Sequence, residues 1–370
     1  MSDRLGVGVV GCGIGGHHVR AYQSLSDRFN VLAICDIDGV RAHELAAEHN
    51  VPRVSSDLAE LCQWDELEVI DICTPSHLHF SQVRQALAAG KHVVCEKPVA
   101  GSLQEVDELI RAEAQSGRRV MPIFQYRFGH GLQKLKFLVG EGIAGQAYLT
   151  TVETAWRRRA AYYAAPWRGR WATELGGASV TLAIHAHDAL YYVLGPARSV
   201  LAHTATLVNP IETEDCVSAS LQMADGSLAS LSVTTGSAIQ ISRHRFCFSN
   251  LTAESNTQPY TNTSEPWVFS GDSPELTGQI EEALARFVAL PEGFVGQFYR
   301  FHQALRGEAE LPVTLADARA SLELIAAIYH SAQTGQAVEL PIGKGHPKYG
   351  GWQPEIPARA RNAGALPPSR

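Results

Sequence analysis

The sequence predicts an α/β protein in two parts: an amino-terminal doubly wound parallel sheet, and a carboxy-terminal α+β domain with a largely antiparallel open sheet. Two observations support this. Short apolar runs alternate with helix-like segments over the first 125 residues, and alternating strand-like stretches joined by polar turns follow from Ala147 onward. At 370 residues the chain is too long for one ordinary core. We therefore expect two domains, over residues 1–125 and 126–370.

Composition and charge exclude several classes of function. The chain is 45% hydrophobic and 19% charged, and no apolar run approaches the roughly 20 residues of a membrane span. A net charge of −7 disfavours nucleic acid as a partner, because such binding depends on neutralising phosphates. The first residues lack a signal-peptide pattern, and the seven cysteines include no Cys-x-x-Cys pair. We expect a cytoplasmic protein without a metal, with a loose tail over residues 358–370.

Five apolar runs in the first part are separated by about 20 to 35 residues, which is the spacing of β-α-β units. In a parallel sheet, ligands bind beyond the carboxyl ends of the strands. The residues that follow each run should therefore carry the chemistry. The runs are 5–10, 30–35, 68–73, 92–95 and 119–124.

The first run is followed by Gly-Cys-Gly-Ile-Gly-Gly, a match to GxGxxG that opens a helix-like segment. Such glycines allow a tight turn and close approach of a pyrophosphate to the helix amino end. The second run is followed by Asp36, 20 residues after Gly16, where a carboxylate accepts hydrogen bonds from the ribose of NAD. No arginine follows Asp36 immediately, so NAD is favoured over NADP, although Arg41 is the side chain that could accept a 2′-phosphate. The pattern predicts a Rossmann domain with cofactor contacts from Gly11, Cys12, Gly13, Ile14, Gly15 and Asp36.

Two further motifs follow later runs: Cys-Thr-Pro-Ser-His-Leu-His at 73–79 and Cys-Glu-Lys-Pro-Val-Ala at 95–100. With the glycine motif, in this order, the set resembles the family of glucose-fructose oxidoreductase, inositol dehydrogenase and the rhizopine catabolism proteins. The resemblance extends from about residue 5 to residues 342–352. It implies hydride transfer between nicotinamide and a secondary alcohol of a sugar, sugar derivative or cyclitol. The cofactor contacts expected in this region are Thr74, Pro75, His77, His79, Glu96, Lys97 and Gln125.

Lys97 is the first candidate catalytic residue. It lies at the carboxyl end of a predicted parallel strand, near the expected nicotinamide ring. Partial burial beside a positive ring depresses the pKa of a lysine, which can then exchange a proton with an alcohol. The alternative from position alone is a surface lysine before a proline. With the flanking motifs, we interpret Lys97 as a catalytic and substrate-binding residue.

The second part of the chain predicts an antiparallel sheet flanked by helices. The stretch 216–235 alternates apolar and polar residues around Asp225-Gly226, which is typical of a hairpin. Helix periodicity is present in 130–142, 176–196 and 317–335. The cleft between this part and the nucleotide-binding part is the expected substrate site.

The helix predicted over 176–196 carries a polar stripe beside an apolar one. His185 and His187 are two residues apart and point about 160° away from each other, so they do not bind one metal ion. His187 falls on the apolar stripe and is interpreted as a satisfied core histidine. The polar stripe holds Thr181, His185 and Asp188. The family resemblance implies that His185 holds or relays the proton of the alcohol with Lys97, that Asp188 bonds a substrate hydroxyl or orients the imidazole, and that Thr181 lies at the substrate. The family has an acidic or amide residue where this chain has Thr181.

Arginines alternate with aromatic residues over 155–171, and Arg127 follows the last strand of the first part. In an acidic protein this favours a pocket wall, where rings cover a sugar face and guanidinium groups bind hydroxyls or an acid. A surface segment whose arginines pair with carboxylates is the alternative. We expect Trp167 and Arg168 at the cofactor, and Arg127, Tyr163 and Arg170 at the substrate.

The leading interpretation is thus an NAD-dependent sugar or cyclitol dehydrogenase with Lys97 and His185 in proton transfer. The alternative is an NAD-binding sensor or regulator of the same fold without turnover. Family resemblance further implies a homo-oligomer, a dimer or tetramer, built on the open sheet. It leaves open whether the cofactor is released in each cycle.

Overall fold

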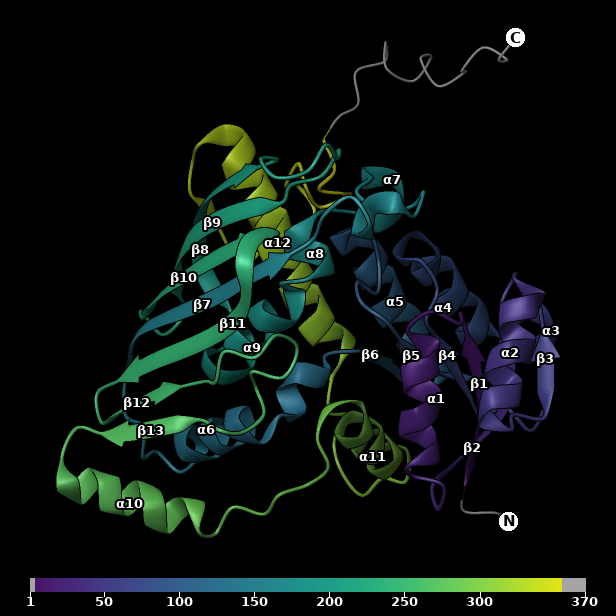
Figure 1. Ribbon diagram of the computed structural model, residues 1–370, viewed down its shortest axis with the longest axis horizontal. Coiled ribbons are helices and arrows are strands. Elements are labelled where there is room, and N and C mark those ends of the chain that lie inside the picture. The colour runs from purple at the N-terminus through teal and green to yellow at the C-terminus, as the bar shows by residue number, and fades with distance from the viewer. Residues whose placement is uncertain (1–3, 355–370) are drawn as a thin grey trace.

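Six parallel strands form the amino-terminal sheet, in the order β3-β2-β1-β4-β5-β6. This computed structural model describes residues 4–354, so the predicted tail at 358–370 lies outside the described residues. All five predicted runs form strands, and the strand order confirms the doubly wound α/β arrangement (Figure 1). Of the six strands, only the short β3, at one edge, lies outside the predicted runs. The strands are β1 (Leu5–Val10), β2 (Phe29–Cys35), β3 (Arg53–Ser55), β4 (Val69–Ile72), β5 (His92–Cys95) and β6 (Val120–Pro122).

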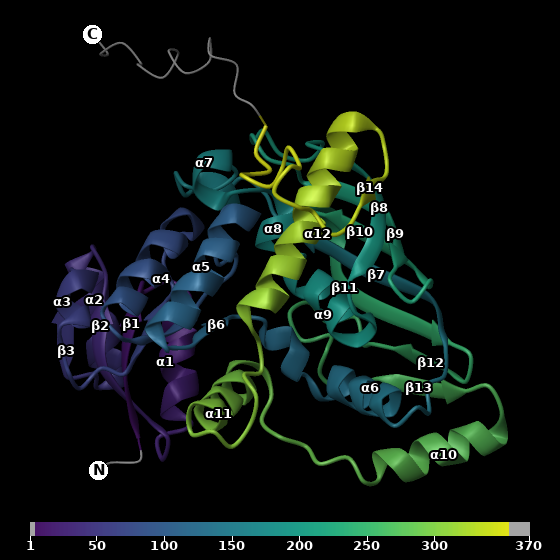
Figure 2. The ribbon, with the colours of Figure 1, turned by 180° about the vertical axis from the view of Figure 1, so that it is seen from behind.

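Helices cover both faces of this sheet. Helix α1 packs against α11, which comes from the second half of the chain, and α4 packs against α5 (Figure 2). Side chains of Asp38, Asp57 and Ser102 cap the amino ends of α2, α3 and α5, which fixes where these helices begin. The helices are α1 (Gly15–Gln23), α2 (Gly39–His49), α3 (Leu58–Cys62), α4 (His79–Ala88), α5 (Leu103–Ser116) and α11 (Gly293–Leu305).

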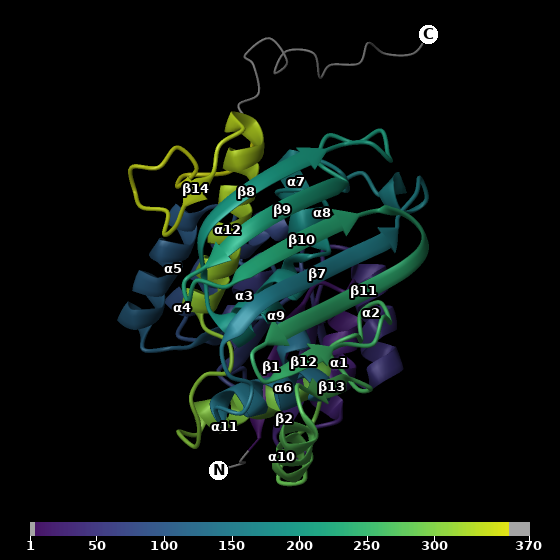
Figure 3. The same ribbon diagram turned by 90° about the vertical axis from the view of Figure 1, so that its left-hand side faces the viewer.

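Eight strands form the second sheet, in the order β13-β12-β11-β7-β10-β9-β8-β14. Its pairs are antiparallel except for β7 with β10, which confirms a largely antiparallel sheet. Gly226, at φ 89°, turns the predicted hairpin between β9 and β10. Figure 3 faces this sheet, whose strands lie in front of the helices. The strands are β7 (Ala147–Arg157), β8 (Ala197–Ala205), β9 (Cys216–Met223), β10 (Leu228–Thr234), β11 (Gly236–Phe248), β12 (Leu251–Glu254), β13 (Val268–Gly271) and β14 (Val338–Glu339).

The remaining helices lie between the two sheets or at their ends. Helix α9 packs on β7, and α12 packs on β8 and also on α5 of the first half. Helix α12 therefore joins the two halves. No helix among residues 4–354 is long and apolar enough to cross a membrane. These helices are α6 (His130–Gly140), α7 (Trp171–Glu174), α8 (Ala178–Thr181), α9 (Ile184–Leu194), α10 (Pro274–Leu284) and α12 (Leu315–Thr334), with 3₁₀ turns η1 (Ser76–Leu78), η2 (Gln125–Phe128) and η3 (Tyr162–Ala164).

The prediction of one continuous helix over 176–196 is wrong. The segment forms two helices, α8 and α9, because the amide of Ala183 bonds to the carbonyl of Ala178 at 2.9 Å, five residues earlier. This wider turn interrupts the α-helical register at Leu182. Thr181 and His185 consequently belong to different helices and do not share one stripe.

Candidate active site

The turn after β1 forms an open cradle at the carboxyl ends of the strands. Gly11 adopts φ 101°, and an added Cβ would lie 2.6 Å from the carbonyl oxygen of Cys73. The amide of Cys12 donates to Oδ2 of Asp36 at 2.7 Å, while Oδ1 accepts from the amide of Asp38. Asp36 is thereby fixed beside the glycine turn, as the sequence predicts.

The residues of this cradle fit a dinucleotide. Gly13 and Ile14 are exposed, and an added Cβ on Gly13 would meet no atom within 4 Å. Gly15 lies at the first position of α1, and an added Cβ there would lie 3.1 Å from Val9, so the helix packs closely on the sheet. A pyrophosphate can therefore approach the amino end of α1, with Asp36 available to ribose hydroxyls.

The loop after β4 does not present both of its histidines to the cofactor. His79 is 1% exposed, and its two ring nitrogens lie 2.7 Å from the carbonyl of Pro98 and 2.8 Å from that of Thr74. This corrects the expectation that His79 contacts the cofactor, since it joins the loops after β4 and β5 instead. His77 is exposed, with Nδ1 3.3 Å from the carbonyl of Thr173. Thr74 and Pro75 are half-buried at the start of the same loop.

Lys97 follows β5 and points across to the second half of the chain. Its Nζ donates to the carbonyl oxygen of Thr181 at 2.7 Å. Burial lowers the pKa of Lys97, the negative charge of Glu96 acts in the opposite direction, and the positive charge of Arg168 lowers it further. The lowered pKa favours the unprotonated amine, the form that accepts a proton.

His185 lies at the start of α9, close enough for the charge of Lys97 to act on it. Burial, and then the charge of Lys97, lower the pKa of His185 to about 3, so the imidazole is neutral. Its ring stacks on Tyr126 at 4.9 Å, and its buried Nδ1 has no hydrogen-bond partner among the described residues. The charge of Lys97 thus acts on the imidazole of His185, which is buried against Tyr126.

Thr181 contributes its backbone to the site more than its side chain. Its hydroxyl donates to the carbonyl of Gly177 at 2.8 Å, within α8. Its own carbonyl holds Lys97. The threonine side chain is therefore engaged by its own helix.

Three other side chains that were predicted to contact a ligand bond to groups of the protein instead. Arg127 donates from Nε and Nη2 to both carboxylate oxygens of Asp188, each at 2.7 Å, and Asp188 is fully buried. Arg127 also lies 3.1 Å from Asp317. This corrects the expectation that Arg127 and Asp188 bind substrate, because their polar atoms pair inside the protein. Glu96 is 7% exposed and faces His18 and the amide of Lys97, so it is not at the cofactor surface.

Aromatic rings and arginines lie close together at the end of β7 and in the segment after it. The Arg168 guanidinium lies 4.2 Å from the ring of Trp167 and pairs with Glu174 at 2.9 Å. Arg158 lies over the rings of Trp156, Tyr162 and Tyr260. Tyr163 is half-buried and Arg170 is exposed.

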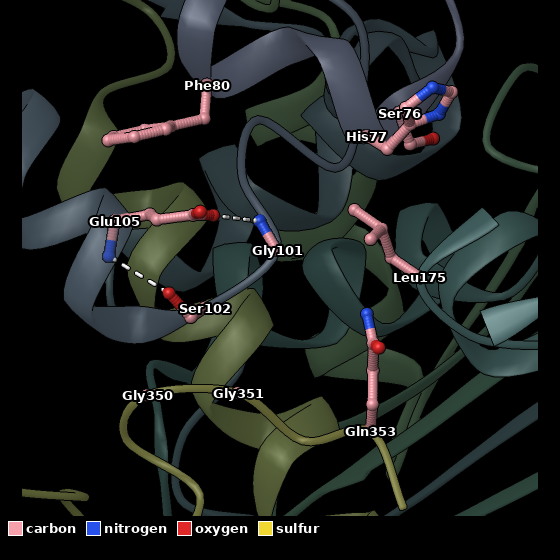
Figure 4. Close-up of a pocket in the computed structure, with 10 residues that line it drawn as sticks. All are labelled: Ser76, His77, Phe80, Gly101, Ser102, Glu105, Leu175, Gly350, Gly351 and Gln353. Atoms are coloured by element: carbon pink, nitrogen blue, oxygen red, sulfur yellow. Dashed lines mark hydrogen bonds between the residues drawn. The ribbon is translucent and has the colours of Figure 1, made fainter. Parts of the chain in front are cut away.

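A cavity of about 390 Å³ opens beside the loops after β4 and β5 (Figure 4). Glu105 accepts a hydrogen bond from the amide of Gly101 across one of its walls, at 2.7 Å. Of the residues predicted to contact a ligand, only His77 is part of the lining. The lining residues are Ser76, His77, Phe80, Gly101, Ser102, Glu105, Leu175, Gly350, Gly351 and Gln353.

Several residues of the site were not predicted. Tyr126 lies between two predicted residues, and its buried hydroxyl has no partner among the described residues. Its position directly after the last parallel strand was the available signal. Glu214 accepts from the amides of Gly177 and Ser179, each at 2.9 Å, and so fixes the start of α8. No sequence pattern marks Glu214, because it acts from a turn before β9.

The fold and this site together define a class of protein: an oxidoreductase that binds NAD. The model described as "Oxidoreductase family, NAD-binding Rossmann fold" matches residues 5–124, and the model described as "GFO/IDH/MocA C-terminal domain" matches residues 132–249. The chain belongs to this family of glucose-fructose oxidoreductase, inositol dehydrogenase and rhizopine catabolism proteins, which confirms the predicted family and the Rossmann domain.

Individual relatives cover the chain to different extents. An uncharacterized oxidoreductase of Synechocystis sp. is 31% identical to this chain. The match covers 63% of this chain and 66% of that relative. The D-glucoside 3-dehydrogenase of Escherichia coli is 27% identical, covering 92% of this chain and 98% of the relative. The WlbA dehydrogenase of Bordetella pertussis, solved with NADH and UDP-GlcNAcA, is 30% identical with a TM-score of 0.81, over 92% of this chain and all of that one.

Proposed function

We propose that this protein oxidises a secondary alcohol of a sugar, sugar derivative or cyclitol, with Lys97 and His185 in proton transfer. One observation carries the proposal. The charge of Lys97 acts on the buried imidazole of His185, and buried polar atoms of His185 and of the neighbouring Tyr126 have no partner among the described residues. Unpartnered buried polar groups are costly unless a ligand satisfies them.

The residues divide the work between them. The glycine turn and Asp36 hold the dinucleotide, which when bound supplies the hydride acceptor. Neutral His185 accepts a hydrogen bond from the alcohol, and the amine of Lys97, whose pKa burial lowers, takes up the alcohol proton in its unprotonated form. The carbonyl of Thr181 keeps the Lys97 amine oriented, at 2.7 Å. Protein groups thus position the alcohol and remove its proton.

The substrate class draws support from two relatives with different names. One is a D-glucoside 3-dehydrogenase, and the other was solved with UDP-GlcNAcA. We therefore propose a glucoside, a nucleotide sugar or an inositol as substrate. The test is absorbance at 340 nm with NAD and a panel drawn from these three classes. If the protein binds NAD but no compound of the panel changes the absorbance at 340 nm, and Lys97→Ala leaves this result unchanged, the sensor alternative would be favoured instead.

We also propose that the protein is a homo-oligomer in the cytoplasm. The exposed face of the second sheet presents large apolar side chains, Tyr148, Leu201 and Leu228, which a second copy would cover. All seven cysteines are free thiols, which is typical of a reducing compartment. Sedimentation velocity of the wild type and of Leu201→Glu tests the interface, since the variant should sediment as a smaller species.

A further inference from the structure

Behind Lys97, buried charged side chains form a continuous chain. His18 of α1 lies between two carboxylates: Nδ1 is 2.8 Å from Oδ2 of Asp71, and Nε2 is 3.2 Å from Oε1 of Glu96. His18 and Asp71 are fully buried, and Glu96 is 7% exposed. The other oxygen of Glu96 accepts from the amide of Lys97 at 3.1 Å. The chain thus leads from Asp71 through His18 and Glu96 to the proposed catalytic lysine.

Packing holds the imidazole of His18 in this position. The rings of Phe294 and Phe298 on α11 lie 4.5 and 5.3 Å from it. Sγ of Cys73 lies 3.3 Å from Nδ1 of His18. The ligand atoms of His18, Asp71 and Cys73 are close enough to hold a metal ion. Because His18 and Asp71 already bond to each other, we interpret the group as a hydrogen-bonded chain.

The charges in this chain alternate. Burial lowers the pKa of His18, but the charge of Asp71 outweighs burial and raises that pKa well above its usual value. Burial raises the pKa of Glu96, yet the hydrogen bond and charge of His18 bring it down to about 2. At neutral pH an imidazolium therefore separates two carboxylates, and the negative charge of Glu96 faces Lys97.

We propose that His18 is a positioning residue that keeps Glu96 ionised and oriented beside Lys97, and thereby sets the pH at which Lys97 can accept the substrate proton. The inference rests on the proposed function of Lys97. It assigns to α1 a second task, besides binding the dinucleotide: the helix that begins at Gly15 also carries the cation that controls the catalytic amine.

Other charged groups near the chain set the background for any pH effect. Tyr22 from α1 and Cys73, directly after β4, face Asp71 and His18. Lys97 is acted on by Arg168 and Glu174 from the segment after β7, in addition to Glu96. His185 of α9 is neutral. None of these groups is altered by the variants below.

The test begins with His18→Gln, which keeps a polar side chain but removes the cation. Glu96 then loses the hydrogen bond and the positive charge that lower its pKa, and burial favours its protonated form. Loss of the charge on Glu96 lowers the pKa of Lys97, so the acid limb of kcat/KM for alcohol oxidation should move to lower pH by about one unit. We expect kcat to fall about tenfold as Lys97 loses its orientation, with the Kd for NAD within about twofold of wild type.

Two further variants make the test specific. In a Glu96→Gln background, His18→Gln should produce no additional shift, because His18 acts through Glu96. Asp71→Asn, which keeps the shape of the side chain, should also move the acid limb of kcat/KM to lower pH. The control is His302→Gln. His302 is a buried histidine of α11, and its ring packs on Phe29 at the amino end of β2. It should leave the acid limb in place.

The titration of Lys97 should also be followed by NMR of isotopically labelled lysine, which does not depend on turnover. A folded His18→Gln protein whose Lys97 titrates as in wild type would overturn the inference. A shifted titration would support it even if Lys97→Ala were fully active, an outcome that would overturn the proposed function alone.

Discussion

At the scale of single residues, Lys97 and His185 differ in how they are held. Lys97 has a defined acceptor, the carbonyl of Thr181 at 2.7 Å, whereas His185 is held by its stacking on Tyr126 at 4.9 Å. Burial lowers the pKa of both groups, which favours the unprotonated amine of Lys97 as proton acceptor; an imidazole with a pKa of about 3 is a weak base, so His185 is suited to accept a hydrogen bond from the alcohol.

Removing either group should therefore slow the chemistry with little effect on cofactor binding. We expect Lys97→Ala and His185→Ala each to lower kcat by roughly 10² or more, the scale of general acid-base groups, with the Kd for NAD nearly unchanged. Steady-state kinetics and a fluorescence titration with NADH measure the two quantities. Wild-type kcat in either variant would remove that residue from the proposed mechanism.

Asp36 should set the choice between NAD and NADP. Its carboxylate is fixed by the amides of Cys12 and Asp38, so it cannot swing away from a 2′-phosphate. The wild type should bind NAD more tightly than NADP. Asp36→Ala should weaken the binding of NAD and narrow the difference between the two affinities. Isothermal titration with both dinucleotides decides the matter, and equal wild-type affinities would contradict the prediction.

The sequence predicted those residues of the site whose role depends on a strand end. Gly11, Asp36 and Lys97 follow β1, β2 and β5, and parallel topology brings such positions to one edge. It did not predict which polar groups pair with each other. The ion pair between Arg127 and Asp188 joins residues 61 apart in sequence, and no local pattern distinguishes it from two substrate contacts.

At the scale of elements, the interruption between α8 and α9 is the main departure from the sequence prediction. The apolar residues of 176–196 keep a helical spacing in the sequence. A single wider turn between α8 and α9 rotates one helix relative to the other, but it leaves no mark in the amino-acid composition. The interruption exposes the carbonyl of Thr181 to Lys97. Periodicity reports which residues are buried but not where a helix breaks.

The close packing at the start of α8 can be tested with a single methyl group. An added Cβ at Gly177 would lie 1.8 Å from the carbonyl oxygen of Glu214, so Gly177→Ala requires a backbone shift. We expect about 2 kcal/mol or more of destabilisation and lower kcat, because α8 carries the carbonyl that holds Lys97. Urea unfolding and kinetics measure both effects.

Gly278→Ala is the matched control for that experiment. Gly278 lies inside α10, where an added Cβ would meet nothing within 4 Å. Alanine should stabilise the protein by about 0.5 to 1 kcal/mol. Stabilisation by Gly177→Ala as well would show that the contact with Glu214 is not tight.

Thr181→Val tests whether the side chain or the backbone of this residue serves the site. The variant loses the hydrogen bond from Oγ1 to Gly177, which should cost about 1 kcal/mol of stability. The pH profile of kcat/KM should be unchanged, because Lys97 bonds to the carbonyl. A displaced profile in a folded Thr181→Val protein would show that the hydroxyl acts on the reacting groups.

At the scale of the whole molecule, buried neutral histidines should make stability depend on pH. Burial lowers the pKa of His185 and His187 to about 3 and that of His244 to about 4. His187 is buried as predicted, but it is not satisfied, since neither ring nitrogen has a partner among the described residues. Unfolding allows all three imidazoles to protonate at the ordinary pKa near 6.5.

The sign of the effect follows from these pKa values. Above about pH 6.5 these imidazoles are neutral in both the folded and the unfolded protein, so their contribution to the free energy of unfolding is fully present. This contribution is lost as the pH falls toward 4, because only the unfolded protein takes up the protons. Each should cost about 1.4 kcal/mol per pH unit in that window. Differential scanning calorimetry should show Tm falling below pH 6.5, with a shallower fall in His187→Leu. A Tm constant from pH 7 to 4.5 would contradict this account.

The strands of the first sheet lie early in the chain, yet the end of β6 is held by residues that follow much later. Gln297 of α11 accepts from the amide of Phe124 and donates to the carbonyl of Pro122, at the end of β6. Trp352 donates to the carbonyl of Leu175, two residues before the Gly177 turn. These contacts close loops of more than a hundred residues, which is slow relative to local folding. During synthesis, a nascent chain that already contains every glycine of the cradle and both proposed catalytic residues therefore still lacks the contacts that complete the end of β6 and the loop at Leu175, and these form only after α11 and the turn around Trp352 have left the ribosome.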